Sequence, residues 1–282
     1  MLAPPPHSPA RILIACDKFK GSLDAAAVCT ALARGMAARF PQAAVEIHPI
    51  ADGGEGFAAS LEIPLGGRWL EAPAHDALGR PVRARYLMAE AADGPLAVIE
   101  MAEASGMWRI RPEERDILRA STFGTGEMMR HAIEQCGARR LVIGLGGSAT
   151  NDGGAGMAAA LGVRFLDAHD RPLRTSPAWL LDKLARIDLS ERMPLPPVTA
   201  ACDVDSPLLG NQGATRVFGP QKGADAASIP MLENVLETIA RLSGGMETAG
   251  TPGAGAAGGL GFGLMRFAGA RLESGFGLLA SL

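Results

Sequence analysis

Charged and hydroxyl side chains gather with glycines in four short stretches of this sequence, and each stretch directly follows an apolar run. Residues 17–22 read DKFKGS, residues 52–56 DGGEG, residues 146–154 GGSATNDGG and residues 202–206 CDVDS. Lysines and backbone N–H groups bind phosphate, carboxylates hold a metal ion or accept a proton from a hydroxyl group, and glycines permit close approach of the backbone. One stretch alone is a weak signal, but together they supply the parts of a phosphoryl-transfer site.

The stretch at 144–154 is the most informative, because it can bind an anion in more than one way. Its segment GLGGSA (144–149) matches the loose dinucleotide-binding pattern G-x-G-x-x-G/A, and Asp167 lies 23 residues after Gly144. The loop then continues as TNDGG, which is long and polar for the tight turn of that pattern. We therefore favour a general anion cradle of backbone N–H groups, a hydroxyl group and a helix N-terminus, and we keep the dinucleotide fold and a plain Gly-rich turn as alternatives.

The lysines and acids of the remaining stretches also allow two interpretations. Lysine occurs only at 18, 20, 183 and 222, against 23 arginines, so the positions that keep an ammonium group are candidates for phosphate contact. The alternative at 18 and 20 is a solvated lysine pair. The carboxylates of DGGEG can hold Mg²⁺ or position a hydroxyl group, or they are solvated acids in a turn. Asp203 and Asp205 end an apolar run two residues apart, so their side chains start on one face.

The composition excludes several classes of protein. The 282 residues carry a net charge of −3, which offers no broad positive surface for nucleic acid or an anionic membrane. The four cysteines show no CxxC spacing and are typical of a reducing compartment, so we expect a cytoplasmic protein. Residues 1–10 (MLAPPPHSPA) lack signal-peptide features and are expected to form a disordered leader. The uncharged run 248–265 contains seven glycines, which argues against a membrane span.

The polar stretches need a scaffold, and the apolar runs before them predict one. Runs at 11–16, 45–50, 140–145 and 198–202 are expected to be buried strands, and a helix over 23–39 is expected to begin after Ser22 as its N-cap. An Ala-rich helix should end near residue 161. Strands that end in polar loops and lead into helices are typical of an α/β fold with a parallel sheet, whose site lies at the carboxyl ends of the strands.

Two further features complete the predicted organisation. Runs at 82–88 and 96–102, joined through Asp93 and Gly94, predict an antiparallel strand pair, and helices are expected near 124–136 and 229–242. The length predicts about two domains. We expect a Rossmann-like parallel-sheet domain that holds the strands at 11–16, 45–50 and 140–145, and an inserted mixed-sheet α/β domain. The first is expected to comprise 11–70 and about 116–165, and the second about 71–115 and 166–282.

Eight stretches make the sequence similar to the bacterial glycerate kinase family of type 1. They are ACDKFKGSL (15–23), PIADGGEGF (49–57), EMAEASGM (100–107), STFGTGEM (121–128), GLGGSATNDGGAGM (144–157), ACDVDSPLLGNQGA (201–214), FGPQKGA (218–224) and PGAGAAGGLGFGL (252–264). The resemblance implies ATP-dependent phosphorylation of D-glycerate with Mg²⁺ by a two-domain α/β protein. Family members continue with another strand-rich segment that closes the first domain, so the resemblance also implies a C-terminally incomplete Rossmann-like domain.

This interpretation assigns a role to each candidate residue. Asp203 is expected to orient and deprotonate the acceptor hydroxyl group, with Asp52 and Lys18 as further catalytic residues, and Asp52 and Asp205 are expected to hold Mg²⁺. Arg216 and Glu55 are expected to bind glycerate, the arginine through a bidentate pair with its carboxylate. The expected phosphate and nucleotide contacts are Lys20, Gly146, Gly147, Ser148, Asn151, Asp152 and Lys222.

The favoured product is 2-phosphoglycerate, and phosphorylation at O3 is the alternative. The sequence also allows a nucleotide-dependent oxidoreductase built on the GLGGSA loop, or a non-catalytic truncated remnant that binds glycerate or ATP without turnover. The expected partners are D-glycerate and ATP, with no nucleic acid and no membrane.

Overall fold

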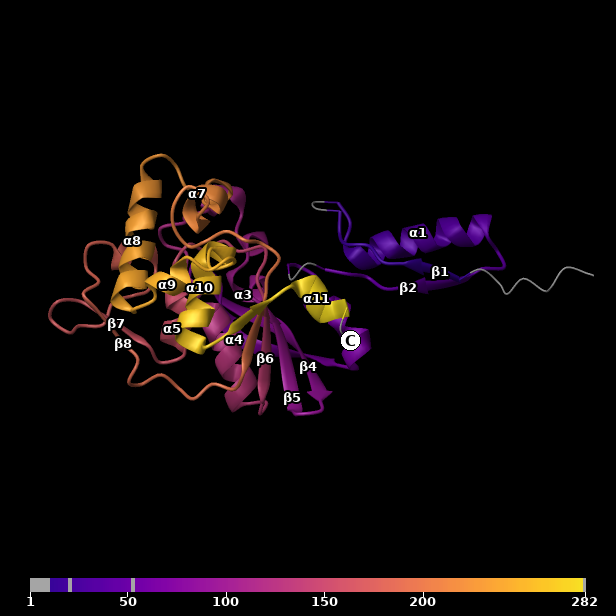
Figure 1. Cartoon of the computed structure of the whole chain (residues 1–282), viewed down its shortest axis with the longest axis horizontal. Helices are drawn as coiled ribbons and strands as arrows, with labels where there is room; N and C mark the ends of the chain where they lie inside the picture. The colour runs from indigo at the N-terminus through magenta and orange to yellow at the C-terminus, as the bar shows by residue number, and fades with distance from the viewer. Residues whose placement is uncertain (1–10, 20–21, 52–53, 281–282) are drawn as a thin grey trace, which may run out of the picture.

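A six-stranded mixed sheet forms the centre of the molecule (Figure 1). The structure is a computed structural model that describes residues 11–19, 22–51 and 54–280. Lys20 and Asp52, two of the predicted site residues, lie outside these ranges. In spatial order the strands are β10 (Arg271–Glu273), β9 (Val198–Ala201), β6 (Arg140–Gly144), β5 (Gly94–Glu100), β4 (Pro81–Ala91) and β3 (Arg68–His75).

The direction of the strands determines where the polar stretches meet. Strands β10, β9, β6 and β5 run parallel to one another, whereas β4 is antiparallel to both β5 and β3. The carboxyl ends of the four parallel strands therefore lie at one edge of the sheet, which is where α/β proteins bind their ligands. The polar stretches 146–154 and 202–206 both leave the sheet at this edge.

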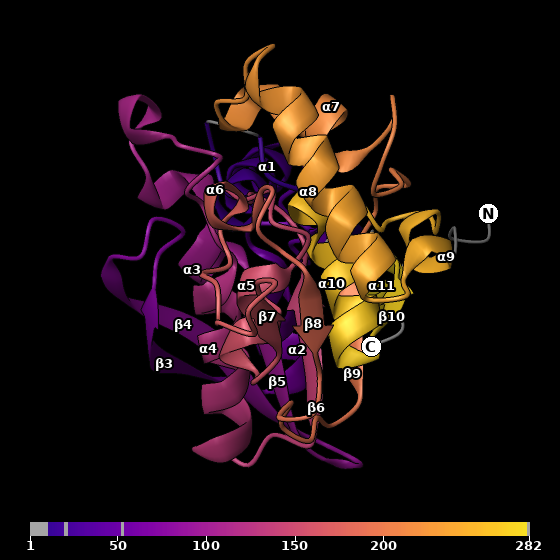
Figure 2. The ribbon, with the colours of Figure 1, turned by 90° about the vertical axis from the view of Figure 1, so that its left-hand side faces the viewer.

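Both faces of the sheet are covered, because successive side chains of a strand point to opposite faces. Ala97 and Ile99 of β5 join the largest hydrophobic core on one face, and Leu96 and Val98 join a second core on the other face. Burial on both faces explains the nearly continuous apolar run of this strand. Figure 2 faces the side of the larger core. The helices on that side are α4 (Phe123–Glu134), α5 (Ala155–Ala160) and α10 (Ala256–Ala268).

The opposite face is covered by α2 (Phe57–Leu65), which buries Phe57 and Leu61 against the sheet, and Leu278 of α11 (Gly275–Ala280) packs nearby.

A third hydrophobic core lies beside the sheet and includes Phe165 and Phe262. The elements around it are β7 (Arg164–Leu166), which pairs antiparallel with β8 (Arg186–Asp188), and the helices α6 (Pro177–Leu180), α7 (Ala214–Phe218), α8 (Ser228–Leu242) and α9 (Met246–Ala249). Short helices α3 (Ala102–Ser105), η1 (Met107–Arg109), η2 (Pro112–Glu114) and η3 (Pro220–Lys222) connect the larger elements.

The N-terminal elements form a separate unit, on the right in Figure 1. In this unit β1 (Arg11–Ile14) pairs in parallel with β2 (Ala44–Ile47), and α1 (Ala25–Arg39) connects them. The predicted N-cap Ser22 is wrong, because Asp24 caps α1 and its carboxylate accepts a hydrogen bond from Ala27 N at 2.7 Å. A carboxylate there satisfies an otherwise unpaired amide and interacts favourably with the helix dipole.

The predicted α/β class is confirmed, and so is the antiparallel pair, which is formed by β4 and β5. The prediction that the strand at 140–145 lies with those at 11–16 and 45–50 is wrong, because β6 pairs with β5 and β9 instead. Hydrophobic periodicity identifies a strand but does not specify its pairing partner. The proposed domain boundaries stay a prediction. None of the helices in the described ranges combines the length and the apolar character needed to cross a membrane.

Candidate active site

Two glycine-containing loops pack directly on each other at the carboxyl edge of the sheet. A Cβ atom on Gly146 would lie 2.3 Å from Cα of Gly54, and one on Gly147 would lie 2.8 Å from Oε1 of Glu55. Gly147 also has a φ of +64°, in the left-handed region that favours glycine. The structure therefore brings Gly54 and Glu55 of the DGGEG stretch, about 90 residues before Gly146 and Gly147 in the sequence, into one site with the GGSATNDGG stretch.

The cradle differs from a dinucleotide-binding turn. Helix α5 begins only at Ala155, so a long loop separates it from the end of β6 at Gly144. The dinucleotide pattern requires a helix that starts directly after the glycines. This geometry favours the general anion cradle over the oxidoreductase alternative.

Lys18 reaches the same place from the N-terminal unit. Its Nζ donates a hydrogen bond to the backbone oxygen of Glu55 at 3.1 Å and lies 3.9 Å from Oδ1 of Asp17. The structure therefore brings together Lys18, Glu55, Gly146 and Gly147 of the predicted site residues.

Lys222 lies beneath the cradle and is buried. Its Nζ donates hydrogen bonds to Oγ of Ser148 at 2.6 Å and to the backbone oxygen of Thr150 at 2.7 Å. Burial lowers the pKa of Lys222 to about 7, and the negative charge of Asp152 offsets part of that effect. In this arrangement the ammonium group supports the loop from inside.

Asp152 fastens the cradle to the start of α4. Its Oδ2 accepts hydrogen bonds from N and Oγ1 of Thr122 at 2.7 and 2.9 Å, and from Gly156 N at 3.1 Å. Burial raises the pKa of Asp152, and these hydrogen bonds act in the opposite direction. Asn151, which is also buried, donates from Nδ2 to Oγ1 of Thr215 at 3.0 Å. Both predicted nucleotide contacts therefore have their side chains inside the protein.

The glycines of α10 explain how the loop is held from the other side. A Cβ atom on Gly258 would lie 1.9 Å from the backbone oxygen of Thr150, and one on Gly263 would lie 2.7 Å from Cα of Gly154. Such contacts leave no room for a side chain. The second G-x-G-x-x-G stretch of the sequence, at 253–258, thus serves close helix packing.

Glu100 was not among the predicted site residues, yet it connects the site to the sheet. It is the last residue of β5, and its Oε2 and Oε1 accept hydrogen bonds from Gly56 N at 3.1 Å and Ala58 N at 2.8 Å. Burial raises its pKa to about 7, although the two N–H groups act to lower it. An acid at the end of a buried apolar strand (LAVIE) is a signal that could have identified it.

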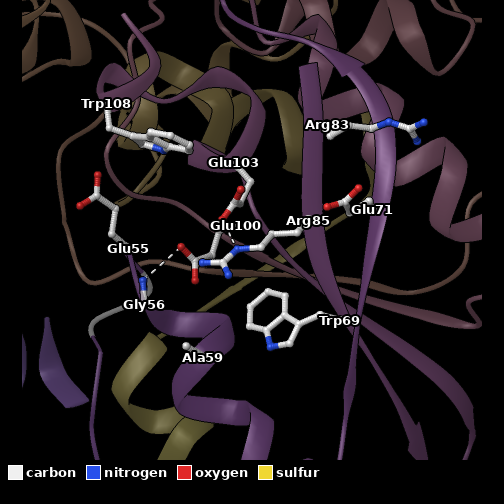
Figure 3. Close-up of a pocket in the computed structure, with 10 residues that line it drawn as sticks. All are labelled: Glu55, Gly56, Ala59, Trp69, Glu71, Arg83, Arg85, Glu100, Glu103 and Trp108. Carbon is white, nitrogen blue, oxygen red and sulfur yellow. Dashed lines mark hydrogen bonds and ion pairs between the residues drawn. The ribbon is translucent and has the colours of Figure 1, made fainter. Parts of the chain in front are cut away.

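A cavity of about 520 Å³ opens beside Glu100 (Figure 3). Arg85 stacks on Trp69, with its guanidinium carbon 4.7 Å from the ring centre, and donates from Nε to Oε1 of Glu103 at 2.9 Å. The volume is ample for a three-carbon acid. The cavity is lined by Glu55, Gly56, Ala59, Trp69, Glu71, Arg83, Arg85, Glu100, Glu103 and Trp108.

Asp203 follows β9 at the same edge of the sheet. Its Oδ1 accepts a hydrogen bond from Oγ of Ser274 at 2.6 Å, and its Oδ2 receives a longer one from Phe276 N at 3.4 Å. Asp203 and Asp205 both line a second cavity of about 310 Å³. Arg216 is exposed and makes no hydrogen bond or ion pair with another described residue.

The described residues do not form a preassembled metal centre. In ranges 11–19, 22–51 and 54–280, no group of three or more His, Cys, Asp and Glu side chains is arranged to hold a metal ion. A magnesium ion that arrives with nucleotide phosphates keeps several waters and needs only one or two protein carboxylates. Asp205 fits such a role, and Asp52, the other expected ligand, is outside the described residues.

Comparisons with known proteins agree with the sequence resemblance. The model of the glycerate kinase family matches residues 12–282. A glycerate kinase of Bacillus subtilis is 44% identical over 275 residues, which cover 95% of this chain and 71% of that protein. A glycerate 2-kinase of Escherichia coli is 41% identical over 277 residues, which cover 96% of this chain and 72% of that protein. A crystal structure assigned as glycerate kinase 2 from Salmonella typhimurium matches with a TM-score of 0.84 at 39% identity, over 97% of this chain and 74% of that one.

Proposed function

This chain belongs to the glycerate kinase family, and on that basis we propose that it transfers the γ-phosphoryl group of ATP to a hydroxyl group of D-glycerate. The observation that carries the proposal is the direct packing of Gly54 and Glu55 on the anion cradle at the carboxyl edge of the sheet. This packing supports a site in which a phosphate group and a small acceptor meet. The proposed product is 2-phosphoglycerate, in line with the relative named glycerate 2-kinase.

The proposed roles follow from the geometry of each group. The backbone of Gly146 and Gly147 binds phosphate, while buried Lys222 holds Ser148 in place. Lys18 brings a positive charge to the DGGEG loop, where it would stabilise negative charge on the transferred phosphoryl group. Arg216 and Glu55 remain the proposed glycerate contacts, and the exposed guanidinium group of Arg216 is free to pair with a carboxylate.

Asp203 is the proposed general base. The hydrogen bond from Ser274 orients its carboxylate through Oδ1, and among the residues that the structure describes only Phe276 N, at a longer distance, donates to Oδ2. A lone pair on Oδ2 is therefore available for the proton of the acceptor hydroxyl group. Proton transfer to this oxygen would accompany attack of the hydroxyl oxygen on the γ-phosphorus.

Mg²⁺ is proposed to bind together with ATP. When bound, the ion neutralises charge on the phosphate oxygens, and Asp205 with Asp52 would hold it.

The cytoplasm is the proposed location, and the free state of all four cysteines supports a reducing environment.

A coupled assay of ADP release tests this function. We expect release that depends on D-glycerate, ATP and Mg²⁺ together, and phosphorus NMR of the product should show 2-phosphoglycerate. A signal from 3-phosphoglycerate alone would overturn the proposed regiochemistry. Release of ADP that does not depend on glycerate would overturn the proposed acceptor.

A further inference from the structure

We propose that Glu100 is a positioning residue, whose ionised carboxylate holds residues 54–58 against the anion cradle and thereby couples phosphoryl transfer to pH. The consequence for catalysis rests on the proposed function, whereas the positioning itself does not. Glu100 would act through the loop and not by contact with the reacting atoms.

Glu100 holds the start of α2 through two backbone hydrogen bonds, which together we call the clamp. The residue before α2, Gly56, has a φ of +90° and supplies no side-chain cap, so the first amides of the helix need an acceptor from elsewhere. Glu100 supplies it from β5, with one carboxylate oxygen for Gly56 N and the other for Ala58 N. Figure 3 shows the carboxylate directed at Gly56 from the floor of the cavity. Glu100 thus caps the N-terminus of α2, although it lies 44 residues after Gly56 in the chain.

The clamp is connected to the cradle through Gly54 and Glu55. Gly54 and Glu55 lie immediately before the clamped amides and are the residues that touch Gly146 and Gly147. Lys18 Nζ donates its hydrogen bond to the backbone oxygen of Glu55. A shift of this backbone would therefore displace both the lysine and the wall of the cradle.

Protonation of the Glu100 carboxylate would weaken the clamp. A carboxylate accepts through both oxygens, whereas a neutral acid carries a hydrogen on one of them, which would then face a backbone N–H donor. Protonation therefore opens one half of the clamp. Burial and the negative charge of Glu103 raise the pKa of Glu100 into the neutral range, while the two backbone N–H groups and Arg85 lower it. The other charged groups that line the cavity around Glu100 are Glu55, Glu71 and Arg83.

Steady-state kinetics of Glu100→Gln across pH 5.5–9 provide the first test. Glutamine keeps the size of the side chain, but its amide group cannot ionise and presents NH₂ to one of the two backbone donors. We expect kcat to fall roughly tenfold to hundredfold at pH 8, with a smaller change in KM, because displaced groups slow the reaction more than they weaken binding. We expect the wild-type enzyme to show an acidic limb near pH 7, and this limb should be absent from the variant.

Glu103→Gln is the matched control, since Glu103 lines the same cavity but pairs its carboxylate with Arg85 and Arg109. This variant should keep the acidic limb, because Glu100 still ionises in it. An acidic limb of unchanged size and midpoint in Glu100→Gln would overturn the coupling to pH.

Hydrogen exchange of the amides at 54–58, followed by mass spectrometry, tests the clamp without any assay of activity. In the wild-type protein, protection corrected for the intrinsic exchange rate should be greater at pH 8 than at pH 6. Glu100→Gln should lose this difference, and Glu103→Gln should keep it. Equal protection at both pH values in the wild type would overturn the proposal even if Glu100→Gln did not fold. A protein with the expected exchange but no glycerate kinase activity would refute the proposed function and leave the clamp intact.

Discussion

At the scale of single residues, the site separates groups that face the ligand from groups that hold the loop. Ser148, Asn151, Asp152 and Lys222 are all buried, and each side chain makes at least one hydrogen bond inside the protein, although Oδ1 of Asn151 makes none. Buried polar groups of this kind are costly to disrupt, because a lost partner leaves an unsatisfied donor or acceptor. We therefore expect substitutions among them to affect stability and activity together.

Lys222→Met tests this for the buried ammonium group. We expect a loss of about 1–3 kcal/mol in the free energy of unfolding, since Oγ of Ser148 and the backbone oxygen of Thr150 lose their donor. The folded-state pKa is lowered to about 7, so the unfolded chain binds more protons between that value and 10.5, and the wild-type free energy of unfolding should rise with pH across this window. Urea unfolding at pH 7 and pH 9 should show a smaller rise in the variant.

The exposed Lys183, which lies over the ring of Trp179, offers a matched control. Lys183→Met should change the free energy of unfolding by less than about 0.5 kcal/mol. An equal loss in the two variants would contradict a special role for the buried ammonium group.

Asp203→Asn tests the proposed general base. We expect kcat to fall by about 10²–10⁴-fold, because asparagine cannot accept the hydroxyl proton. Ser274→Ala removes the hydrogen bond that orients the carboxylate, together with the one that Oγ of Ser274 accepts from Gly277 N, but it leaves the base in place, so it should have a smaller effect on kcat. Turnover of the two variants is measured by ADP release. A decrease of less than tenfold in kcat for Asp203→Asn would assign the base to another residue.

At the scale of elements, the site depends on the ends of strands and helices that are distant in the sequence. The end of β5 caps α2, and the loop after β6 is held between the start of α4 and the glycines of α10. Residues 257–259 of α10 have positive φ values, so this helix begins with a kink where it meets the cradle. An L side chain is strained in that conformation. Glycine is therefore needed at 258 and 259, where the backbone of the kink also touches the backbone of the cradle loop.

Gly258→Ala measures the importance of this contact. Its new Cβ atom would meet the backbone oxygen of Thr150, so we expect a loss of about 2–4 kcal/mol in the free energy of unfolding. Gly269→Ala is the matched control, because Gly269 also has a positive φ, +65°, but no atom lies within 4 Å of its Cβ position. That variant should lose only about 1 kcal/mol. Chemical denaturation measures both losses. Equal losses of unfolding free energy in the two variants would show that backbone strain alone, and not the contact with Thr150, causes the effect.

At the scale of the whole molecule, the N-terminal unit differs from the rest in how much it buries. Its two strands form a sheet of their own, and the three largest hydrophobic cores contain no residue of β1, α1 or β2. Several of its large apolar side chains are exposed, among them Leu13, Phe40 and Ile47. A two-stranded unit with little buried area has little independent stability.

We therefore expect this unit to open before the six-stranded sheet does. Native-state hydrogen exchange should give β1 and β2 amides a lower opening free energy than those of β5 and β6, whose strands are covered on both faces. Since Lys18 reaches the site from this unit, we expect ATP and glycerate together to slow exchange in β1 and β2. Exchange at the same rate in all four strands would show that the molecule opens as one unit.

The sequence by itself determined the α/β class, the family, the antiparallel pair β4–β5 and the helices α1, α4, α5 and α8, because these depend on local periodicity and on short motifs. It also identified the loops that meet at the site, since polar residues after apolar strands are expected at one edge of a parallel sheet. It predicted the wrong cap for α1, where Ser22 and Asp24 are both acceptable N-caps by type.

Only the tertiary structure decided which strands pair and which polar side chains are buried. The placement of β6 between β5 and β9 depends on contacts across about 40 to 60 residues, which no local pattern encodes. For the same reason the sequence could not show that Lys222 and Asp152 lie inside the cradle, or that Glu100 caps a helix far from it in the chain. Burial and pairing are properties of the assembled molecule, and they determine whether a charged side chain meets a ligand or supports the loop that does.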